Sequence, residues 1–125
     1  MANFSEEMKL TVWNKAKTIP NFDSAKYRQD PCGAWMCFSD YGNTESDYGW
    51  EIDHIFPEAK GGTDHIDNLC AMNWKNNRSK DDDFPKFQTA TTSKGNENVD
   101  SVKEVDWGSE TIKKIKKLYP HNQYV

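Results

Sequence analysis

The sequence predicts a small α+β protein, on three observations. Its 125 residues are the size of one ordinary domain. Five Trp, five Tyr and six Phe can build a core although only 35% of the residues are hydrophobic. Strand-like and helix-like segments alternate between Trp50 and Lys80. We therefore expect one domain over residues 1–125, with a core motif at about 48–83 flanked by an N-terminal helix, an extra strand and a C-terminal helix.

The N-terminal third contains one predicted helix and one predicted strand. Ser5 is a good N-cap, and the helix from Ser5 to about Lys17 places acidic residues in its first turn. Pro20 marks its end. Residues 33–38 are predicted to form a strand, and the turn residues 41–43 lead towards the next one. One face of the helix carries its apolar residues, Met8, Val12, Trp13 and Ala16.

The central segment is predicted to fold as strand, loop, strand and helix. Residues 50–55 alternate as a strand does, and a loop over 56–67 bends at Gly61-Gly62. Residues 68–72 form a second strand, and Asn73 can cap a helix from Trp74 to about Lys80. Asp53 and His54 are neighbours, so a regular strand would direct their side chains to opposite sides. We therefore expect the strand to twist or end at His54.

The C-terminal third is predicted to contain a loop and a helix. Residues 88–101 include few large apolar side chains, so we expect a mobile loop there. Ser109 is the expected N-cap of the last helix. Its inward face is formed by Ile112, Ile115, Leu118 and Tyr119, and its outward face by Lys113, Lys114, Lys116 and Lys117, for which a solvated surface is favoured over nucleic-acid contact.

The most informative motif begins with the pair Asp53-His54. Asn68 follows His54 by 14 positions, and Asn77 follows Asn68 by 9 and precedes Lys80 by 3. This ordered set resembles the HNH nuclease motif, in the variant with asparagine as its third signature residue. The resemblance implies a ββα-metal fold and hydrolysis of phosphodiester bonds.

The family's roles transfer to the matching positions. His54 would be the general base, and Asp53 and Asn77 would hold one divalent metal ion, with Mg²⁺ expected and Mn²⁺ able to substitute. Asn68 would orient His54 and fasten the loop. Lys80 and Arg78 are candidate phosphate contacts, with ordinary surface charge as the alternative. Glu51 could add a ligand, although an ion pair is the favoured reading, and His65 is expected to be an exposed loop residue.

The chain departs from a common family pattern, in which two Cys-x-x-Cys pairs bind a structural zinc ion. Its three cysteines include Cys32 and Cys37 with four residues between them, and the second pair's places hold Asn73 and Asn76. We therefore expect no structural zinc. Packing would brace the site instead, with Trp35, Trp50, Phe56, Met72 and Trp74 as candidates.

The charge of the chain indicates how well it can bind nucleic acid. The net charge is −4, whereas nucleic-acid binders are usually basic. Residues 31–72 contain eight acidic residues against one lysine, while residues 73–80 contain three basic residues and no acid. Binding by the protein alone should then be weak and salt-sensitive, and a protein partner could deliver the substrate. The sequence lacks a signal peptide and a membrane-spanning stretch and has an odd number of cysteines, so a cytoplasmic location with free thiols is expected.

Together these features favour a metal-dependent endonuclease that cuts DNA. Two alternatives remain open. One is a degenerate HNH fold that binds nucleic acid or protein without cleavage, which the acidic charge would suit. The other is a nuclease directed at RNA or acting as a toxin, since nothing in the motif reads a base or a 2′-hydroxyl.

Overall fold

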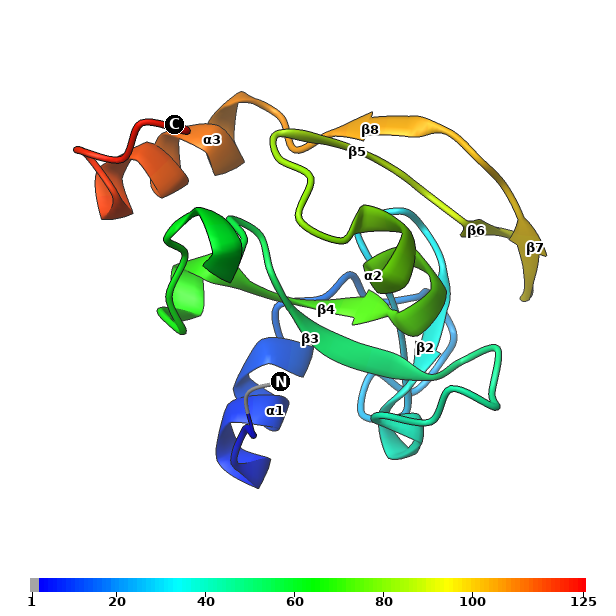
Figure 1. Ribbon diagram of the computed structural model, residues 1–125. Coiled ribbons are helices and arrows are strands. Elements are labelled where there is room, and N and C mark those ends of the chain that lie inside the picture. Colours follow the sequence, from blue (N-terminus) through cyan, green and yellow to red (C-terminus); the bar gives the residue numbers. More distant parts are fainter. Residues whose placement is uncertain (1–2) are drawn as a thin grey trace.

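The computed structural model describes residues 3–125 as a mixture of helices and short strands (Figure 1). Among these residues, no helix has the length and apolar character needed to cross a bilayer. In chain order the elements are α1 (Glu6–Trp13), β1 (Tyr27–Gln29), β2 (Trp35–Cys37), η1 (Phe38–Asp40), β3 (Trp50–His54), η2 (Glu58–Lys60), η3 (Ile66–Asn68), β4 (Leu69–Asn73), α2 (Trp74–Lys80), β5 (Lys86–Gln88), β6 (Thr91–Lys94), β7 (Glu97–Asp100), β8 (Glu104–Asp106) and α3 (Ser109–Leu118).

The antiparallel pair β3–β4 lies at the centre, with α1 and α2 on opposite sides of it (Figure 1). Its register pairs Ile52 with Ala71 and His54 with Leu69. Because side chains alternate along a strand, Ile52 faces α1 while Glu51 and Asp53 face α2. The strand ends at His54, as its position beside Asp53 predicted.

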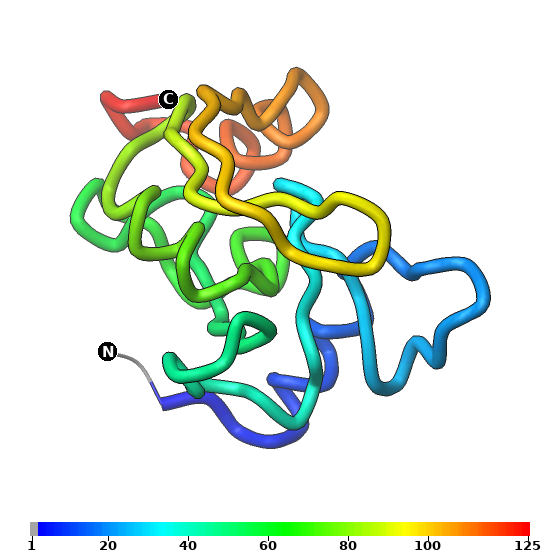
Figure 2. Tube along the Cα trace, turned by 90° about the vertical axis from the view of Figure 1, so that its right-hand side faces the viewer, coloured from blue at the N-terminus to red at the C-terminus, as the bar shows by residue number. Residues whose placement is uncertain are grey.

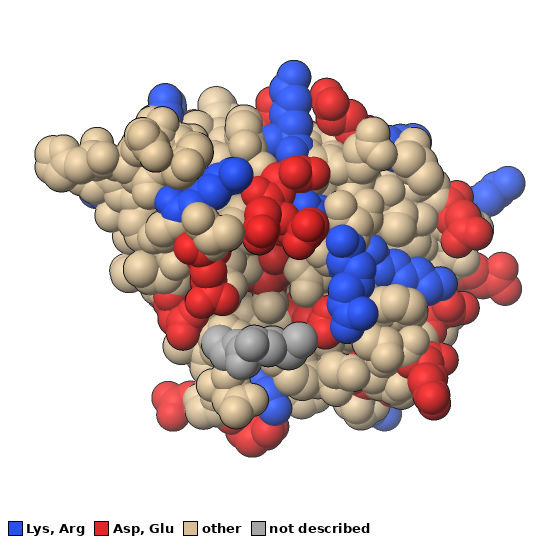
Figure 3. Space-filling model, viewed as in Figure 1, with Lys and Arg blue, Asp and Glu red and all other residues tan. Residues whose placement is uncertain are grey.

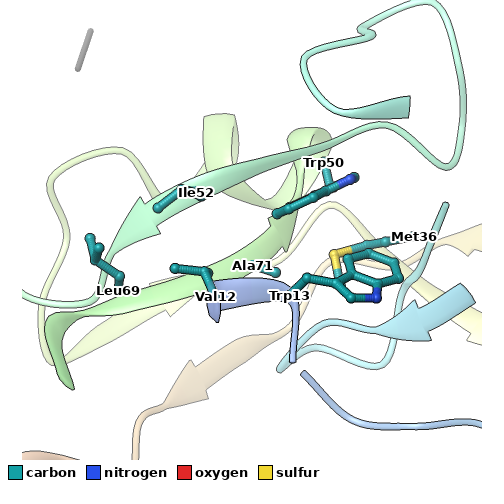
Figure 4. Close-up of a cluster of buried hydrophobic side chains, with 7 residues drawn as sticks. All are labelled: Val12, Trp13, Met36, Trp50, Ile52, Leu69 and Ala71. Carbon is teal, nitrogen blue, oxygen red and sulfur yellow. The ribbon is translucent and has the colours of Figure 1, made fainter. Parts of the chain in front are cut away.

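The main hydrophobic core fills the α1 side of this hairpin (Figure 4). Trp13 is completely buried and its ring centroid lies 5.1 Å from that of Trp50. Trp13 also donates from Nε1 to the carbonyl of Ser24, so its polar atom is paired. The buried members of this cluster are Val12, Trp13, Met36, Trp50, Ile52, Leu69 and Ala71.

A second, smaller core joins the loop after β3 to the C-terminal helix. Ile55 and Phe56 are buried against Ile115 of α3. The Phe56 ring lies 5.4 Å from that of Tyr119, just after the helix. The Cα trace accordingly brings the C-terminal segment next to the loop that follows β3 (Figure 2). The inward face predicted for this helix is confirmed, with Ile115 buried and its lysines exposed.

The N-terminal helix is shorter than predicted. Ser5 caps it as expected, accepting from the backbone N–H of Met8 at 3.1 Å. The helix ends at Trp13 rather than Lys17 because the backbone of Lys17 pairs with Gln29, through hydrogen bonds of 3.2 and 2.9 Å. Tertiary pairing thus overrides the local helical tendency. The strand containing Gln29, β1, was not predicted.

The prediction of a loop over residues 88–101 was wrong. The segment contains β6 and β7, which pair with each other, and it continues into the β5–β8 pair. Few large apolar side chains hold these strands, which is why the sequence pattern missed them. Two side-chain amides attach them instead. Asn76 accepts from the N–H groups of Ala90 and Thr91, and Asn98 accepts from the N–H of Trp35.

The second half of the central motif follows the prediction closely. α2 begins at Trp74, and the Asn73 side chain accepts from the N–H of Lys75 at 3.0 Å. The helix ends at Lys80, and Asp81 after it has a φ of 49°. α3 begins at Ser109, so Ser109 is its first residue and not the N-cap that was expected. The N-cap is Gly108, which has no side chain to cap the helix.

Candidate active site

The site is built around the loop that joins β3 to β4. The two glycines at its bend are required by space and by backbone angle. A Cβ atom on Gly62 would lie 1.8 Å from the carbonyl oxygen of Phe56, far inside van der Waals contact. Gly61 has a φ of 109°, which side chains other than hydrogen rarely tolerate. The Gly-Gly pair therefore closes the loop back onto Phe56.

Asn68 fastens this loop from inside. Its side chain is completely buried, accepts from the N–H of Phe56 at 2.7 Å, and donates to the carbonyls of Phe56 and Thr63 at 3.0 and 2.9 Å. The structure thus places Asn68 where it can tie down the loop, one of the two functions expected of it. Its effect on His54 is indirect, through the backbone that it holds.

The imidazole of His54 has 12% of its side-chain surface exposed. Its Nε2 is 2.7 Å from Oδ1 of Asp64, and its Nδ1 is 3.6 Å from Oε1 of Glu58. Sequence reasoning missed both carboxylates. They lie in a loop without periodic pattern, and only its fold brings them to the histidine.

Asp53 faces the other side of the strand and meets Lys80. The Asp53 carboxylate is buried, and its Oδ2 lies 3.3 Å from Nζ of Lys80. Burial raises the pKa of Asp53 to about 6, and the nearby Lys80 ammonium offsets only part of this shift. Lys80 is itself completely buried, so its position does not agree with the expected phosphate contact.

Asn77 and Glu51 form a second contact between α2 and β3. Nδ2 of Asn77 donates to Oε1 of Glu51 at 3.1 Å, and Nη2 of Arg78 lies 3.5 Å from Oε2. The Glu51 side chain is 9% exposed, whereas that of Arg78 is 56% exposed. Glu51 is therefore an ion-pair partner, as favoured from the sequence, and Arg78 stays accessible to a ligand.

Two groups of side chains could hold a metal ion. The first would be formed by Glu51, Asp53 and Asn77 on the α2 side of β3, and their hard oxygen donors suit Mg²⁺. Because burial raises the pKa of Asp53, a cation bound beside its carboxylate would favour the ionised form. The second is formed by His54, Glu58 and Asp64, whose ligand atoms lie within 4.8 Å of one another. The expected pair Asp53 and Asn77 falls in the first group, although Lys80 and Glu51 respectively are their partners here.

Charges of both signs meet on this face (Figure 3). Acidic side chains gather at its middle, and basic side chains lie beside them over α2. Asp81, Asp82 and Asp83 after the helix are all exposed. Arg78 lies over the Trp74 ring, with Cζ 5.9 Å from its centroid, so a cation is held on the exposed surface of α2.

The three cysteines of the described chain are free. Burial raises the pKa of Cys70, which lies beside Asp53 with 3.9 Å between Sγ and Oδ2. Burial likewise raises the pKa of Cys32. High thiol pKa values disfavour the thiolate, the form that attacks carbonyls and binds metals. Cys32 and Cys70 are therefore poor candidates for nucleophiles or metal ligands.

Comparison with protein families gives one match. The model of the HNH endonuclease family covers residues 36–83, which include β3, its loop, β4 and α2. This match bears out, over that segment, the resemblance to the HNH endonuclease family that the motif indicated. Comparisons with curated proteins and with solved structures gave no match. The helices α1 and α3 and the strands β5–β8 lie outside the matched range.

Proposed function

Because residues 36–83 carry the HNH endonuclease domain, we propose that this protein is a divalent-metal-dependent endonuclease that hydrolyses DNA phosphodiester bonds. The observation that supports it most is the surroundings of His54. An imidazole can accept a proton near neutral pH, and this one keeps 12% of its side-chain surface exposed rather than being sealed in the core. The acidic groups that could hold a cation, Glu51 and Asp53, face the other side of the same strand.

In this proposal His54 takes the proton from a water molecule that attacks phosphorus. With its Nε2–H donated to Asp64, the lone pair of Nδ1 is available, and the 3.6 Å to Glu58 leaves this nitrogen without a direct hydrogen bond. Asn68 keeps the loop backbone fixed so that the imidazole is oriented before substrate arrives. The products would carry a 5′ phosphate and a 3′ hydroxyl.

Asp53 and Asn77 are the residues we propose to hold the metal ion, with Glu51 beside them. When bound, a divalent ion would stabilise negative charge on the phosphate and on the departing 3′ oxygen. Lys80 takes a different part from the one expected from the sequence. It forms an ion pair with Asp53 and donates to the carbonyl of His54, so it joins α2 to β3.

Arg78 is the proposed phosphate contact on α2. It is exposed, it carries a permanent charge, and it is supported by Glu51 and Trp74. The acidic residues on the same face oppose phosphate binding. Binding should therefore be weak at high salt, and a protein partner that delivers the nucleic acid remains part of the proposal.

The test is cleavage of supercoiled plasmid by purified protein with Mg²⁺, with Mn²⁺ and with EDTA. His54→Ala is the active-site variant. His121→Ala is the matched control because His121 is exposed and lies outside the site. We expect nicking that requires metal, persists in His121→Ala and disappears in His54→Ala. Competition with unlabelled RNA then separates the two substrates.

Cleavage that survives in His54→Ala would contradict the proposed base. A folded wild-type protein that binds DNA but cuts with neither metal would instead make this chain a binding module with a degenerate site. That outcome is checked by gel shift on the same plasmid fragments at two salt concentrations.

A further inference from the structure

We propose that Asp64 is the positioning residue of the general base, and that the C-terminal segment holds it in place through Tyr119. This rests on the proposed function of His54. The distance of 2.7 Å between Asp64 Oδ1 and His54 Nε2 is the shortest polar contact of that imidazole. A carboxylate at that nitrogen fixes both the tautomer and the ring orientation.

Asp64 cannot hold this position by its own packing. Its side chain is 58% exposed, and an exposed ion pair alone contributes little to ordering. Instead, the backbone of the preceding residue, Thr63, is held by hydrogen bonds. The hydroxyl of Tyr119 accepts from the N–H of Thr63 at 2.9 Å and lies 2.8 Å from its Oγ1. Asn68 holds the carbonyl of the same residue from the opposite side. Thr63 is thus held at both its N–H and its carbonyl group.

Tyr119 is in turn supported by the C-terminal core. Its ring packs on Phe56, and Ile115 one turn earlier is completely buried. Nearby, Nδ2 of Asn122 donates to the carbonyl of Lys60 at 2.7 Å, which adds a second attachment to the loop. Ile115, Tyr119 and Asn122 lie outside the matched range of 36–83. The connection runs from α3 through Tyr119 and Thr63 to Asp64 and His54.

Loss of the Asp64 carboxylate should affect the orientation of the His54 imidazole and not substrate binding. Without the carboxylate, the His54 ring can rotate or take the other tautomer, and Nδ1 no longer faces the water reliably. A misplaced catalytic group can lower the rate by about 100-fold. Substrate affinity should change little, because neither Asp64 nor Tyr119 contributes a positive charge to a phosphate.

The experiment compares Asp64→Asn and Tyr119→Phe with Asp67→Asn. Asp67 is an exposed carboxylate in the same loop and serves as the matched control. On plasmid DNA we expect kcat to fall 10- to 100-fold in Asp64→Asn and less in Tyr119→Phe. KM should stay within about twofold, and Asp67→Asn should behave as wild type. Asp64→Glu should recover part of kcat.

A second measurement does not depend on catalysis. In wild-type protein without metal, NMR should show a slowly exchanging imidazole N–H of His54, protected by Asp64. This signal should be lost in Asp64→Asn, weakened in Tyr119→Phe and retained in Asp67→Asn. If the wild type cuts nothing, the NMR result still tests the positioning, so the two proposals can fail separately.

Two results would overturn the inference. One is an unchanged N–H signal and an unchanged kcat in Asp64→Asn. The other is a loss of Mn²⁺ affinity in Asp64→Asn, measured by calorimetry, with kcat restored by excess Mn²⁺. The second result would make Asp64 a metal ligand in the group with His54 and Glu58.

Discussion

The ammonium of Lys80, completely buried, donates to the backbone carbonyl of His54 at 2.9 Å. The same Nζ atom lies 3.3 Å from the carboxylate of Asp53. One lysine on α2 therefore contacts both members of the motif's central pair. Lys80 thus joins β3 to α2 beside the contact of Asn77 with Glu51, and its complete burial makes this pair sensitive to substitution.

We expect Lys80→Met to lower the free energy of unfolding by about 3–5 kcal/mol, because Asp53 would keep a buried charge without its partner. The double variant Lys80→Met, Asp53→Asn should recover part of that loss. Lys75→Met is the control, since the Lys75–Asp47 pair is at the surface and should change stability by only about 0–1 kcal/mol. Urea denaturation at pH 7.5 measures all three, and similar losses for Lys80→Met and Lys75→Met would contradict the prediction.

The raised pKa of Asp53 predicts how stability depends on pH. The folded protein keeps this proton up to a pH of about 6, whereas an aspartate in the unfolded chain loses it near the ordinary value of 3.8. Between these values the folded state binds more protons, so the free energy of unfolding should decrease as pH rises from about 4 to about 6. Above 6 this contribution levels off.

Asp30, whose pKa burial also raises, acts in the same direction, so a variant is needed to isolate Asp53. In Asp53→Asn the decrease between pH 4 and 6 should be smaller than in wild type. Asp47→Asn, at an exposed position, should keep the wild-type slope. Urea titrations at half-unit pH steps measure the slopes, and equal slopes in wild type and Asp53→Asn would rule out the assignment.

Asn68→Ala should both loosen the loop between β3 and β4 and reduce the proposed DNA cleavage. The change leaves the buried N–H and carbonyl of Phe56 without their partner, at a cost of roughly 1–3 kcal/mol for each unsatisfied group. Thermal unfolding and amide exchange at Phe56 report the loss. Asn96→Ala, at an exposed position between β6 and β7, provides the comparison and should change neither quantity appreciably.

Gly62→Ala should damage the site more than Gly42→Ala does. An added Cβ at Gly62 would meet the Phe56 carbonyl at 1.8 Å, so the loop must open. Gly42 has a positive φ of 73°, but its Cβ would meet nothing within 4 Å, and only backbone strain of about 1 kcal/mol is expected. Denaturation and nicking assays on both variants test the difference, and equal effects would mean that the loop adapts.

Arg78→Ala should weaken substrate binding while leaving chemistry intact. Loss of one phosphate contact should raise KM several-fold and flatten the dependence of log K on log salt by about 0.9. Lys94→Ala removes an equal charge from an exposed position in β6. Binding isotherms at several salt concentrations compare the two, and an unchanged slope in Arg78→Ala would place the phosphate elsewhere.

Local sequence signals determined the central part of the fold. Asn73 caps α2 and the alternation of Trp50, Ile52 and His54 marks β3, so both boundaries were predictable. The strands β6 and β7 were not, because they are attached by the buried amide of Asn76 rather than by an apolar face. Such a contact between residues distant in sequence leaves no periodic pattern.

The candidate site likewise has a part that the sequence predicts and a part that it does not. The Asp53-His54 pair, Asn68 and Asn77 stand at fixed spacings, so their family could be recognised, and the comparison supports it. The neighbours of His54 depend on how the loop closes, and nothing local marks Asp64 as its partner. The burial of Lys80 could not be predicted from the sequence either, because it depends on how α2 packs against β3.

Aromatic contacts cross both borders of residues 36–83, and this matters if the segment is to be grafted onto another protein. Trp50 rests on Trp13, and Phe56 rests on Tyr119, which lie before and after that segment. A shorter peptide excised for grafting onto another protein would carry the signature residues but expose both rings to water. A graft of this domain should therefore include both terminal helices, because Trp13 of α1 and Tyr119 just after α3 cover the two rings of the HNH-like segment.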